Sequence, residues 1–321
     1  EPVAVRIGFA CPPLAAGEST QRQLRVVEGA PAATFGWQRD GSVLRVSFGE
    51  QALLEHDTAF DLERVEATNK PILHLLHPLS GVRLTKGAGG EYSHHRGVFL
   101  GWNKTTVSGR TVDLWHCGNA AQRHAGYLDP LAAHGPVFAR LAALTQWIDA
   151  DHAILGRDVR QVVVWAPDRA QRVRIDFDIR IDSDTPMTLR GDPQHAGFQV
   201  RMANEVAERK DALYVRPETA SGGDNDVWQD LGWAMIRYRL RGQDYDVVHV
   251  SHAENSGPSV YSTRDYGRFG SFPAADVTPE QPLRLRYRLV LRPLGEAEEV
   301  AVGEGEAERT AWLDGPTVRL R

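Results

Sequence analysis

Two adjacent histidines and an arginine precede a short apolar segment that ends at an asparagine. The run is His94-His95-Arg96, followed by Val98 to Trp102 and then Asn103. Imidazole transfers protons or binds metals near neutral pH, and guanidinium holds carboxylates, phosphates or sugar hydroxyls. If the run is extended, its side chains alternate between faces, which places His94 and Arg96 opposite His95. We therefore expect His95 to face a cleft with Asn103 near it, and His94 to be structural. In a loop, both histidines could meet one ligand.

A second group of polar residues surrounds His195. A turn is predicted to deliver this histidine to a strand that begins at Gly197. In such a strand Gln199 and Arg201 share one face, because side chains repeat with a period of two.

Two later stretches add further candidates. His252, Glu254 and Asn255 follow the predicted end of a strand. Tyr266 belongs to a segment rich in aromatic residues and arginine, a composition suited to stacking on a sugar ring and hydrogen-bonding its hydroxyls.

Structural roles compete with each of these interpretations. A single histidine is more often a surface or core residue than a ligand, and the HExxH spacing of many zinc enzymes is absent from the sequence. A metal site is therefore the weaker alternative. No Gly-x-Ser-x-Gly motif, glycine-rich phosphate loop or dinucleotide fingerprint occurs, which disfavours esterases, kinases and dehydrogenases.

Composition narrows the class of protein. The chain has 321 residues, a net charge of -5, 42% hydrophobic residues and two cysteines, Cys11 and Cys117. No basic patch indicates a nucleic-acid partner, no apolar run reaches the ~20 residues that span a bilayer, and a disulfide framework is excluded. Residue 1 is Glu. We expect an exported or periplasmic protein if a leader was cleaved before it, and a cytoplasmic one otherwise.

Alternating apolar and polar residues predict many strands and little helix. The clearest is Val173 to Ile181, which has one apolar and one charged face. Asp40-Gly41 is a typical hairpin turn. Val137 to Asp149 has loose helical spacing and is interpreted as a short helix or a strand. The predicted fold class is all-β, a large antiparallel β-sandwich forming a single domain over residues 1–321. The other predicted strands are Val3–Phe9, Gln23–Val27, Ser42–Phe48, Ile72–Leu76, Val162–Trp165, Met187–Arg190, Gly197–Met202, Trp233–Leu240, Asp244–Val250, Leu283–Leu291 and Val318–Leu320.

The order of these pieces resembles a bacterial family labelled PmoA-like. The residues that carry the resemblance lie between about residues 70 and 292: Pro78 to Val82, His94-His95-Arg96, Gly101, Asn103, Asp113, Trp115, His195 to Arg201, Trp228 to Gly232, His252 to Asn255 and Tyr266 to Phe269. The chain departs from the family pattern after Asp113, which leaves His116 and His124 without an assigned role. The label suggests a methane oxygenase subunit, but the sequence has neither a membrane segment nor a copper site. The resemblance implies a supersandwich similar to galactose mutarotase, with a small-molecule carbohydrate in a cleft on one sheet.

The leading hypothesis is a carbohydrate-active enzyme of hydrolase, lyase or epimerase type. His95 and His195 are the candidate acid and base, with Glu254 (or Glu205) as a further catalytic carboxylate. Elimination or hydration of a keto sugar is one chemistry that such histidines could perform. The predicted substrate-binding residues are His94, Arg96, Asn103, Asp113, Gln199, Arg201, His252, Asn255 and Tyr266. No cofactor is expected, and the oligomeric state is left open. The alternatives are a non-catalytic carbohydrate-binding or partner-binding sandwich and a metal-dependent oxygenase or hydrolase.

Overall fold

The computed structural model describes residues 33–128, 135–192, 194–255, 257, 260–294 and 303–313. Cys11 and the predicted strands Val3–Phe9, Gln23–Val27 and Val318–Leu320 lie outside these residues.

The largest sheet has ten antiparallel strands and carries the candidate site. Its first strands are hairpin-connected, and β1 and β2 meet at the predicted Asp40-Gly41 turn, where Gly41 has φ 54°. Its middle joins strands that are distant in sequence, since β13 pairs with β5 on one side and with β20 on the other. In spatial order the strands are β1 (Phe35–Asp40), β2 (Val43–Phe48), β3 (Gln51–Asp57), β4 (Ile72–Leu75), β5 (Val98–Trp102), β13 (Ala196–Arg201), β20 (Arg268–Ser271), β19 (Tyr261–Arg264), β16 (Val227–Gln229) and β15 (Ser221–Gly222).

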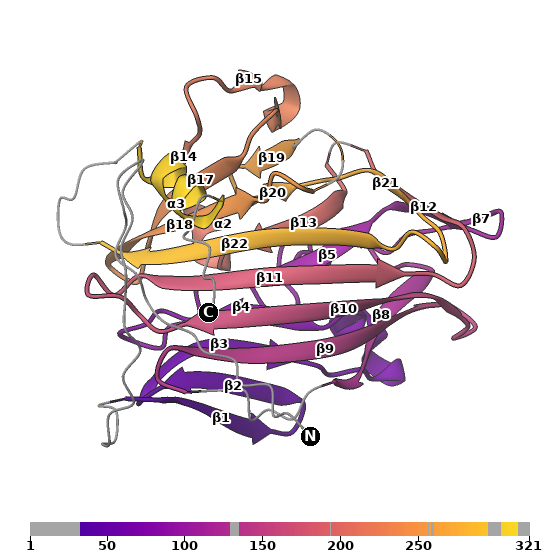
Figure 1. Ribbon diagram of the computed structural model, residues 1–321, viewed down its shortest axis with the longest axis horizontal. Coiled ribbons are helices and arrows are strands. Elements are labelled where there is room, and N and C mark those ends of the chain that lie inside the picture. Colours follow the sequence, from indigo (N-terminus) through magenta and orange to yellow (C-terminus); the bar gives the residue numbers. More distant parts are fainter. Residues whose placement is uncertain are drawn as a thin grey trace, which may run out of the picture.

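An eight-stranded antiparallel sheet forms the second layer and lies in front of the first sheet in Figure 1. Its central strands are long, which gives an extended surface for packing. In spatial order they are β14 (Leu213–Val215), β17 (Trp233–Leu240), β18 (Gln243–Ser251), β22 (Leu283–Pro293), β11 (Val173–Asp182), β10 (Ile154–Trp165), β9 (Phe138–Asp149) and β8 (Ala120–Tyr127).

A small four-stranded sheet and a few short helices complete the described structure. The sheet consists of β21 (Ala275–Val277), β12 (Met187–Arg190), β6 (Lys104–Val107) and β7 (Arg110–Val112). The helices are η1 (Leu62–Arg64), α1 (Val65–Thr68), α2 (Asn204–Arg209), η2 (Asp224–Asp226) and α3 (Gly303–Leu313). No helix in the described part of the chain is long and apolar enough to span a membrane.

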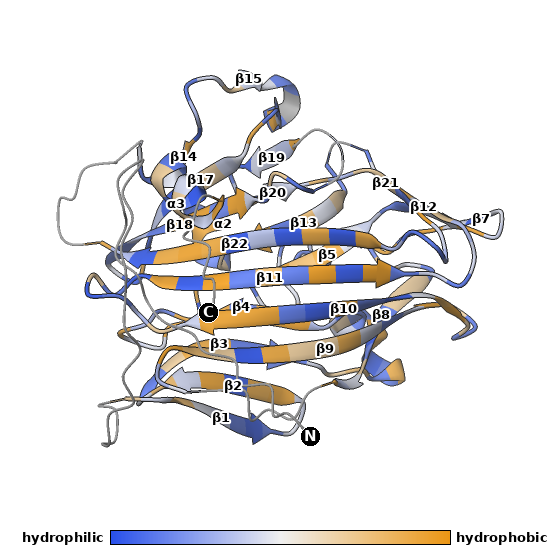
Figure 2. Ribbon diagram, in the orientation of Figure 1, coloured by the Kyte–Doolittle hydropathy of each residue, from blue (hydrophilic) through white to orange (hydrophobic). Residues whose placement is uncertain are grey.

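The hydrophobic core lies between the two large sheets. Phe198 of β13 stacks on Tyr287 of β22, with ring centroids 4.4 Å apart, and also contacts Phe177 of β11 at 4.9 Å. Along β11 the buried and partly exposed residues alternate as predicted, and Figure 2 shows the resulting hydrophobic and hydrophilic bands on β11 and β22. The predicted all-β, antiparallel sandwich is therefore confirmed.

The structure decides between the two interpretations of Val137 to Asp149, because Phe138–Asp149 is the twelve-residue strand β9. Its burial alternates, but apolar residues occupy both faces, with Leu141 and Trp147 on the buried face and Phe138 and Leu144 on the partly exposed one, so the sequence shows no strict alternation. The acidic segment Gly303–Leu313 forms α3, a helix that was not predicted, and Trp233 donates a hydrogen bond from Nε1 to Glu306 of this helix at 2.9 Å.

Candidate active site

The outer face of the ten-stranded sheet carries a row of buried polar side chains. In β13, Phe198 and Val200 belong to the core, so Gln199 and Arg201 project from the opposite face. Both are fully buried there. Arg268 of β20 joins them and donates a hydrogen bond from Nη1 to Oε1 of Gln199 at 2.9 Å. The predicted sharing of one face by Gln199 and Arg201 is confirmed.

Four histidines gather beside this row, and we call them the histidine cluster: His94, His95, His116 and His195. Their rings form a chain in which successive centroids are 4.2 Å (His94 to His95), 4.4 Å (His94 to His116) and 4.9 Å (His116 to His195) apart. They come from a turn before β5, the loop after β7 and the turn before β13. The strand order therefore unites residues that are up to 101 positions apart.

Two members of the cluster are oriented by an aspartate three residues earlier in the chain. His116 Nδ1 donates to Oδ2 of Asp113 at 2.7 Å, and His195 Nδ1 donates to Oδ1 of Asp192 at 2.7 Å. A carboxylate that accepts from Nδ1 fixes the tautomer with Nε2 unprotonated when the ring is neutral. Neither Nε2 atom has a hydrogen-bond partner among the described residues.

The two aspartates are themselves held in place. Oδ1 of Asp113 accepts hydrogen bonds from the backbone N–H groups of Trp115 and His116, both at 2.8 Å. Oδ2 of Asp192 accepts from Nδ2 of Asn103 at 2.8 Å. Burial raises the pKa of Asp192, but the hydrogen bonds from Asn103 and His195 outweigh it and lower the pKa overall. Asp192 therefore stays ionised and acts on its histidine.

Burial also sets the protonation of the histidines. It lowers the pKa of His195, although Asp192 opposes the shift. Burial and the neighbouring His116 lower the pKa of His94 to about 3. His94 is therefore neutral across the physiological range, whereas the ionised Asp192 counteracts the effect of burial on His195.

The expectation that His95 faces a cleft beside Asn103 was wrong. His95 is 2% exposed, and its ring packs against Phe99, Trp115 and Tyr266. Burial first, and then the charge of Arg268, hold its pKa well below the usual value. The ring facing His195 belongs to His116, and Asn103 bonds to Asp192 instead. His94 and His95 sit in a turn, so the alternation argument that separated them does not apply.

Several predicted substrate-binding side chains are already occupied by protein groups. Gln199 donates from Nε2 to the carbonyl oxygens of Ala196 and Ser271, both at 3.3 Å, and accepts from Arg268. Asp113 accepts a hydrogen bond from His116, and Asn103 donates one to Asp192, so both side chains are already engaged. Tyr266 stays close to the cluster, with its ring 6.0 Å from that of His95 and nearly parallel to it.

The predicted residues His252, Glu254 and Asn255 lie elsewhere. His252 and Asn255 line a separate pocket of about 330 Å³ beside Gly232 and Arg309. Glu254 has a side chain that is 76% exposed and pairs with Arg286. Asn255 donates to the Arg286 carbonyl oxygen at 2.8 Å and so ties its loop to β22. No described contact joins any of the three to the histidine cluster, so the placement of Glu254 beside the catalytic histidines was wrong.

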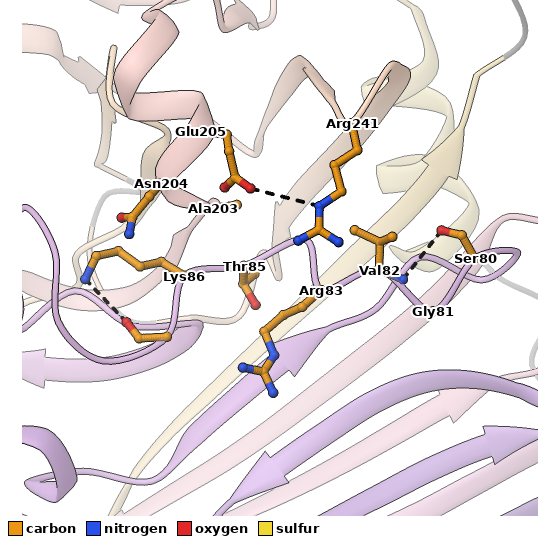
Figure 3. A pocket seen from close by; sticks show the side chains of 11 residues that line it. Ser80, Gly81, Val82, Arg83, Thr85, Lys86, Ala203, Asn204, Glu205 and Arg241 are labelled. Carbon is orange, nitrogen blue, oxygen red and sulfur yellow. Dashed lines mark hydrogen bonds and ion pairs between the residues drawn. The ribbon is translucent and has the colours of Figure 1, made fainter.

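A pocket of about 460 Å³ contains Glu205, the alternative carboxylate (Figure 3). Glu205 points toward Arg241, and the Arg241 Nε to Glu205 Oε1 distance is 4.0 Å. Lys86 lies on the other side of this pocket and donates to the Gly87 carbonyl oxygen at 3.3 Å. Neither Glu205 nor Arg241 contacts the histidine cluster within the described chain.

Within the described ranges, no group of three or more His, Cys, Asp or Glu side chains is arranged to hold a metal ion. In the histidine cluster, Nδ1 of His116 and Nδ1 of His195 each contact a carboxylate.

Sequence reasoning missed His116, Asp192, Arg268 and the lysines Lys70 and Lys86. One signal was present: Asp113 to His116 and Asp192 to His195 repeat the same Asp-x-x-His spacing, which allows a carboxylate to close a turn and bond the ring. No comparable signal marks Lys70, whose Nζ reaches the carbonyl oxygen of Trp115.

Comparisons with known proteins give a family and distant structural neighbours. A galactose mutarotase-like protein from Clostridium acetobutylicum is similar with a TM-score of 0.38 and 7% identity, covering 80% of this chain and 95% of that one. An Escherichia coli K12 protein described only provisionally as an aldose 1-epimerase is similar with a TM-score of 0.37 and 6% identity, covering 82% and 99%. No curated protein matches the chain. The comparisons do not support the PmoA-like label. The model of the family of unknown function DUF6807 matches residues 43–302, and the chain belongs to that family.

Proposed function

We propose that this protein is a carbohydrate-active enzyme that uses His195 and His116 as its acid–base pair. The observation that carries the proposal is the pair of Asp–His dyads whose rings lie 4.9 Å apart. This pairing replaces the earlier assignment of His95 and His195. Such oriented imidazoles typically contribute about 10²- to 10⁴-fold to a proton-transfer reaction.

The proximity of the two rings supports opposite protonation states. Like charges at this separation repel, so the first proton taken up by the pair disfavours the second. One ring then acts as the acid while the other acts as the base. The two could deliver and remove protons in a sugar epimerisation, in an elimination from a keto sugar, or in hydrolysis.

A paired-carboxylate glycosidase mechanism is less well supported. Asp113 and Asp192 both accept hydrogen bonds from their histidines and from neighbouring groups, which commits them to orienting the rings. Glu254 lies outside the cluster.

Aromatic side chains beside the cluster support a sugar as the ligand. Tyr92 is exposed, and its ring lies 4.7 Å from that of Tyr266 and 6.3 Å from that of His94. Tyrosine rings of this kind stack on the C–H faces of pyranoses while their hydroxyls bond to water or substrate.

The test is a product screen with hexoses, glycosides and 3-keto glycosides, followed by proton NMR. Wild type should be compared with His195→Asn and His116→Asn, in which the amide can still donate to the aspartate. His152→Asn is the matched control, since His152 is exposed, lies in the turn between β9 and β10, and has a φ of 66° that Asn tolerates.

We expect kcat to fall by roughly 10²-fold or more in each site variant and to be unchanged in the control. The double variant should lose little more than either single variant, because the two rings act as a unit. Unchanged turnover in His195→Asn and His116→Asn would refute the assignment. Sugar binding without turnover by the wild type would favour the non-catalytic binding protein.

A further inference from the structure

Five cationic side chains are buried beside the histidine cluster, each no more than 2% exposed, and we call them the cation cluster: Lys70, Lys86, Arg96, Arg201 and Arg268. We propose that they bind the anionic group of the substrate, and hence that the substrate class is an acidic sugar bearing a carboxylate or a phosphate. This inference rests on the proposed function for the sugar and for the acid–base chemistry.

The five cations surround the inner members of the site. Arg268 lies over the ring of Trp115, 5.5 Å from its centroid, and Lys70 bonds to the carbonyl oxygen of the same residue. Lys86 donates from Nζ to the carbonyl oxygen of His95 at 3.1 Å. Arg201 lies 5.0 Å from the centroid of Tyr266. The cations therefore share neighbours with the buried end of the histidine cluster.

No carboxylate of the described residues forms an ion pair with these cations, although Glu91, Glu66 and Asp113 act from longer range to raise the pKa of Arg201, Arg96 and Lys70 respectively. Within the described ranges, none of the five has an Asp or Glu oxygen at ion-pair distance. Their partners are neutral: Arg96 bonds to the carbonyl oxygens of Ser93 and Glu66, and Arg201 bonds to that of Tyr266.

Arg160, which is also buried, behaves differently. It donates to Asp158 at 2.6 Å, and the partly exposed Arg237 donates to Asp246 at 2.7 Å. A buried charge without a counter-ion is strongly unfavourable, which is why buried arginines are normally paired. The cation cluster is therefore an exception that a ligand would explain.

Uncommitted donors mark where the anion would be held. Nε and Nη2 of Arg201 and Nη1 of Arg96 are enclosed and have no hydrogen-bond partner among the described residues. The indole Nε1 of Trp115 is likewise enclosed and has no hydrogen-bond partner in the described part of the chain. Nε and Nη2 of a guanidinium form the edge that binds carboxylate or phosphate oxygens in a bidentate manner. Two anionic oxygens would thus satisfy Arg201 and offset the shared charge.

The electrostatics agree with this geometry. Burial lowers the pKa of Lys86 to about 8, with further contributions from Arg201 and Arg96. Burial likewise lowers the pKa of Arg201 overall. Tyr266, Glu91 and Tyr214 oppose the shift, and Arg268 adds a smaller contribution in the direction of burial. A bound anion would reverse both effects, so the cost of keeping the cations together falls when the ligand is present.

The anion site adjoins the surface proposed for the sugar ring. Tyr266 contacts Arg201 on one side and Tyr92 on the other, and its hydroxyl accepts from Nε of Arg268 at 3.3 Å. A sugar stacked on the tyrosines would place an attached carboxylate or phosphate within reach of Arg201.

The test measures thermal stability of the full chain at constant ionic strength. The probes are D-glucuronate and D-gluconate for the carboxylate, D-glucose 6-phosphate for the phosphate, inorganic phosphate and acetate without a sugar, and neutral D-glucose. We expect at least one acidic sugar to raise Tm by roughly 4 °C or more at saturation, and D-glucose to give a much smaller shift. High salt should reduce the shift only modestly, because buried pairs are poorly screened.

Variants locate the effect. Arg201→Gln should abolish the shift, and Arg201→Lys should retain part of it because the charge remains. Arg284→Gln is the control, since Arg284 is exposed and paired with Asp178. If Arg201→Gln does not fold, Arg96→Gln takes its place. The Tm shifts of the wild type with the acidic and neutral ligands still test the anion site in that case. The inference is overturned if no acidic sugar shifts the wild type, if the shift survives in Arg201→Gln, or if inorganic phosphate or acetate alone gives the full effect.

The two proposals can fail separately. Histidine-dependent turnover of neutral sugars, with no response to acidic ones, would overturn the anion site and leave the acid–base pair standing. An Arg201-dependent shift with acidic sugars, together with unaltered turnover in the histidine variants, would retain the anion site and reject the pair.

Discussion

Asn103 and Asp192 are 89 residues apart in the chain, yet Nδ2 of Asn103 donates to Oδ2 of Asp192 at 2.8 Å. The backbone reinforces this contact, because the N–H of Asn103 donates to the carbonyl oxygen of His195 at 3.0 Å. The end of β5 thereby fixes the turn before β13. One oxygen of Asp192 is held by Asn103, which leaves the other to orient His195.

Asp192→Asn should lower kcat while changing KM little. The substituted amide keeps the shape of the turn but removes the negative charge that stabilises a protonated His195, and a comparable change in a serine-protease triad costs about 10⁴-fold. We expect a loss of roughly 10²- to 10⁴-fold, measured by steady-state kinetics on whichever sugar the screen identifies. Asp184→Asn is the matched control, since Asp184 is exposed and paired with Arg157. Equal kcat values in Asp192→Asn and wild type would contradict an orienting role.

Gly101→Ala should destabilise the protein and disturb the loop that carries His116. A Cβ at Gly101 would lie 2.3 Å from the carbonyl oxygen of Leu114, which is backbone and cannot rotate away. We expect a loss of about 1–3 kcal/mol in the free energy of unfolding, measured by urea denaturation. Gly118→Ala tests specificity, because a Cβ there meets no atom within 4 Å. Equal stability of the two variants would show that the sheet and the loop can separate at little cost.

Stability should fall as the pH drops from 7 to 5. Burial lowers the pKa of His56 and of His249 to about 3, and that of His74 to about 4, from the usual 6.5. In this window the unfolded chain binds protons that the folded protein excludes, so stability is fully present above pH 6.5 and is lost on acidification. Each of the three histidines should lower the free energy of unfolding by roughly 2 kcal/mol at pH 5 relative to pH 7.

Urea unfolding at several pH values measures this dependence. His249→Gln should flatten the slope, because one buried imidazole is removed. A wild-type free energy of unfolding that is constant between pH 7 and pH 5 would contradict the neutral, buried state of these three rings.

The local alternation of side chains was readable from the sequence. The run Val173 to Ile181 predicted one buried and one more exposed face for β11, and the spacing of Gln199 and Arg201 placed both on one face of β13. These predictions succeeded because side-chain direction in a strand depends only on position along the chain. The segment Val137 to Asp149 stayed open between helix and strand because apolar residues occupy both of its faces, which removes the alternation from the sequence.

The identity of the paired rings was decided only by the tertiary structure. Sequence placed His95 and His195 together, whereas the structure buries His95 and sets His116 against His195. The repeated Asp-x-x-His spacing could identify each Asp–His pair, but it does not show that the two pairs lie side by side. Their proximity depends on the pairing of β13 with β5, a contact across nearly a hundred residues that carries no local signal. The sequence by itself determined a β-sandwich with a polar, histidine-bearing face, and the order of strands in the sheet determined which of those histidines lie against one another.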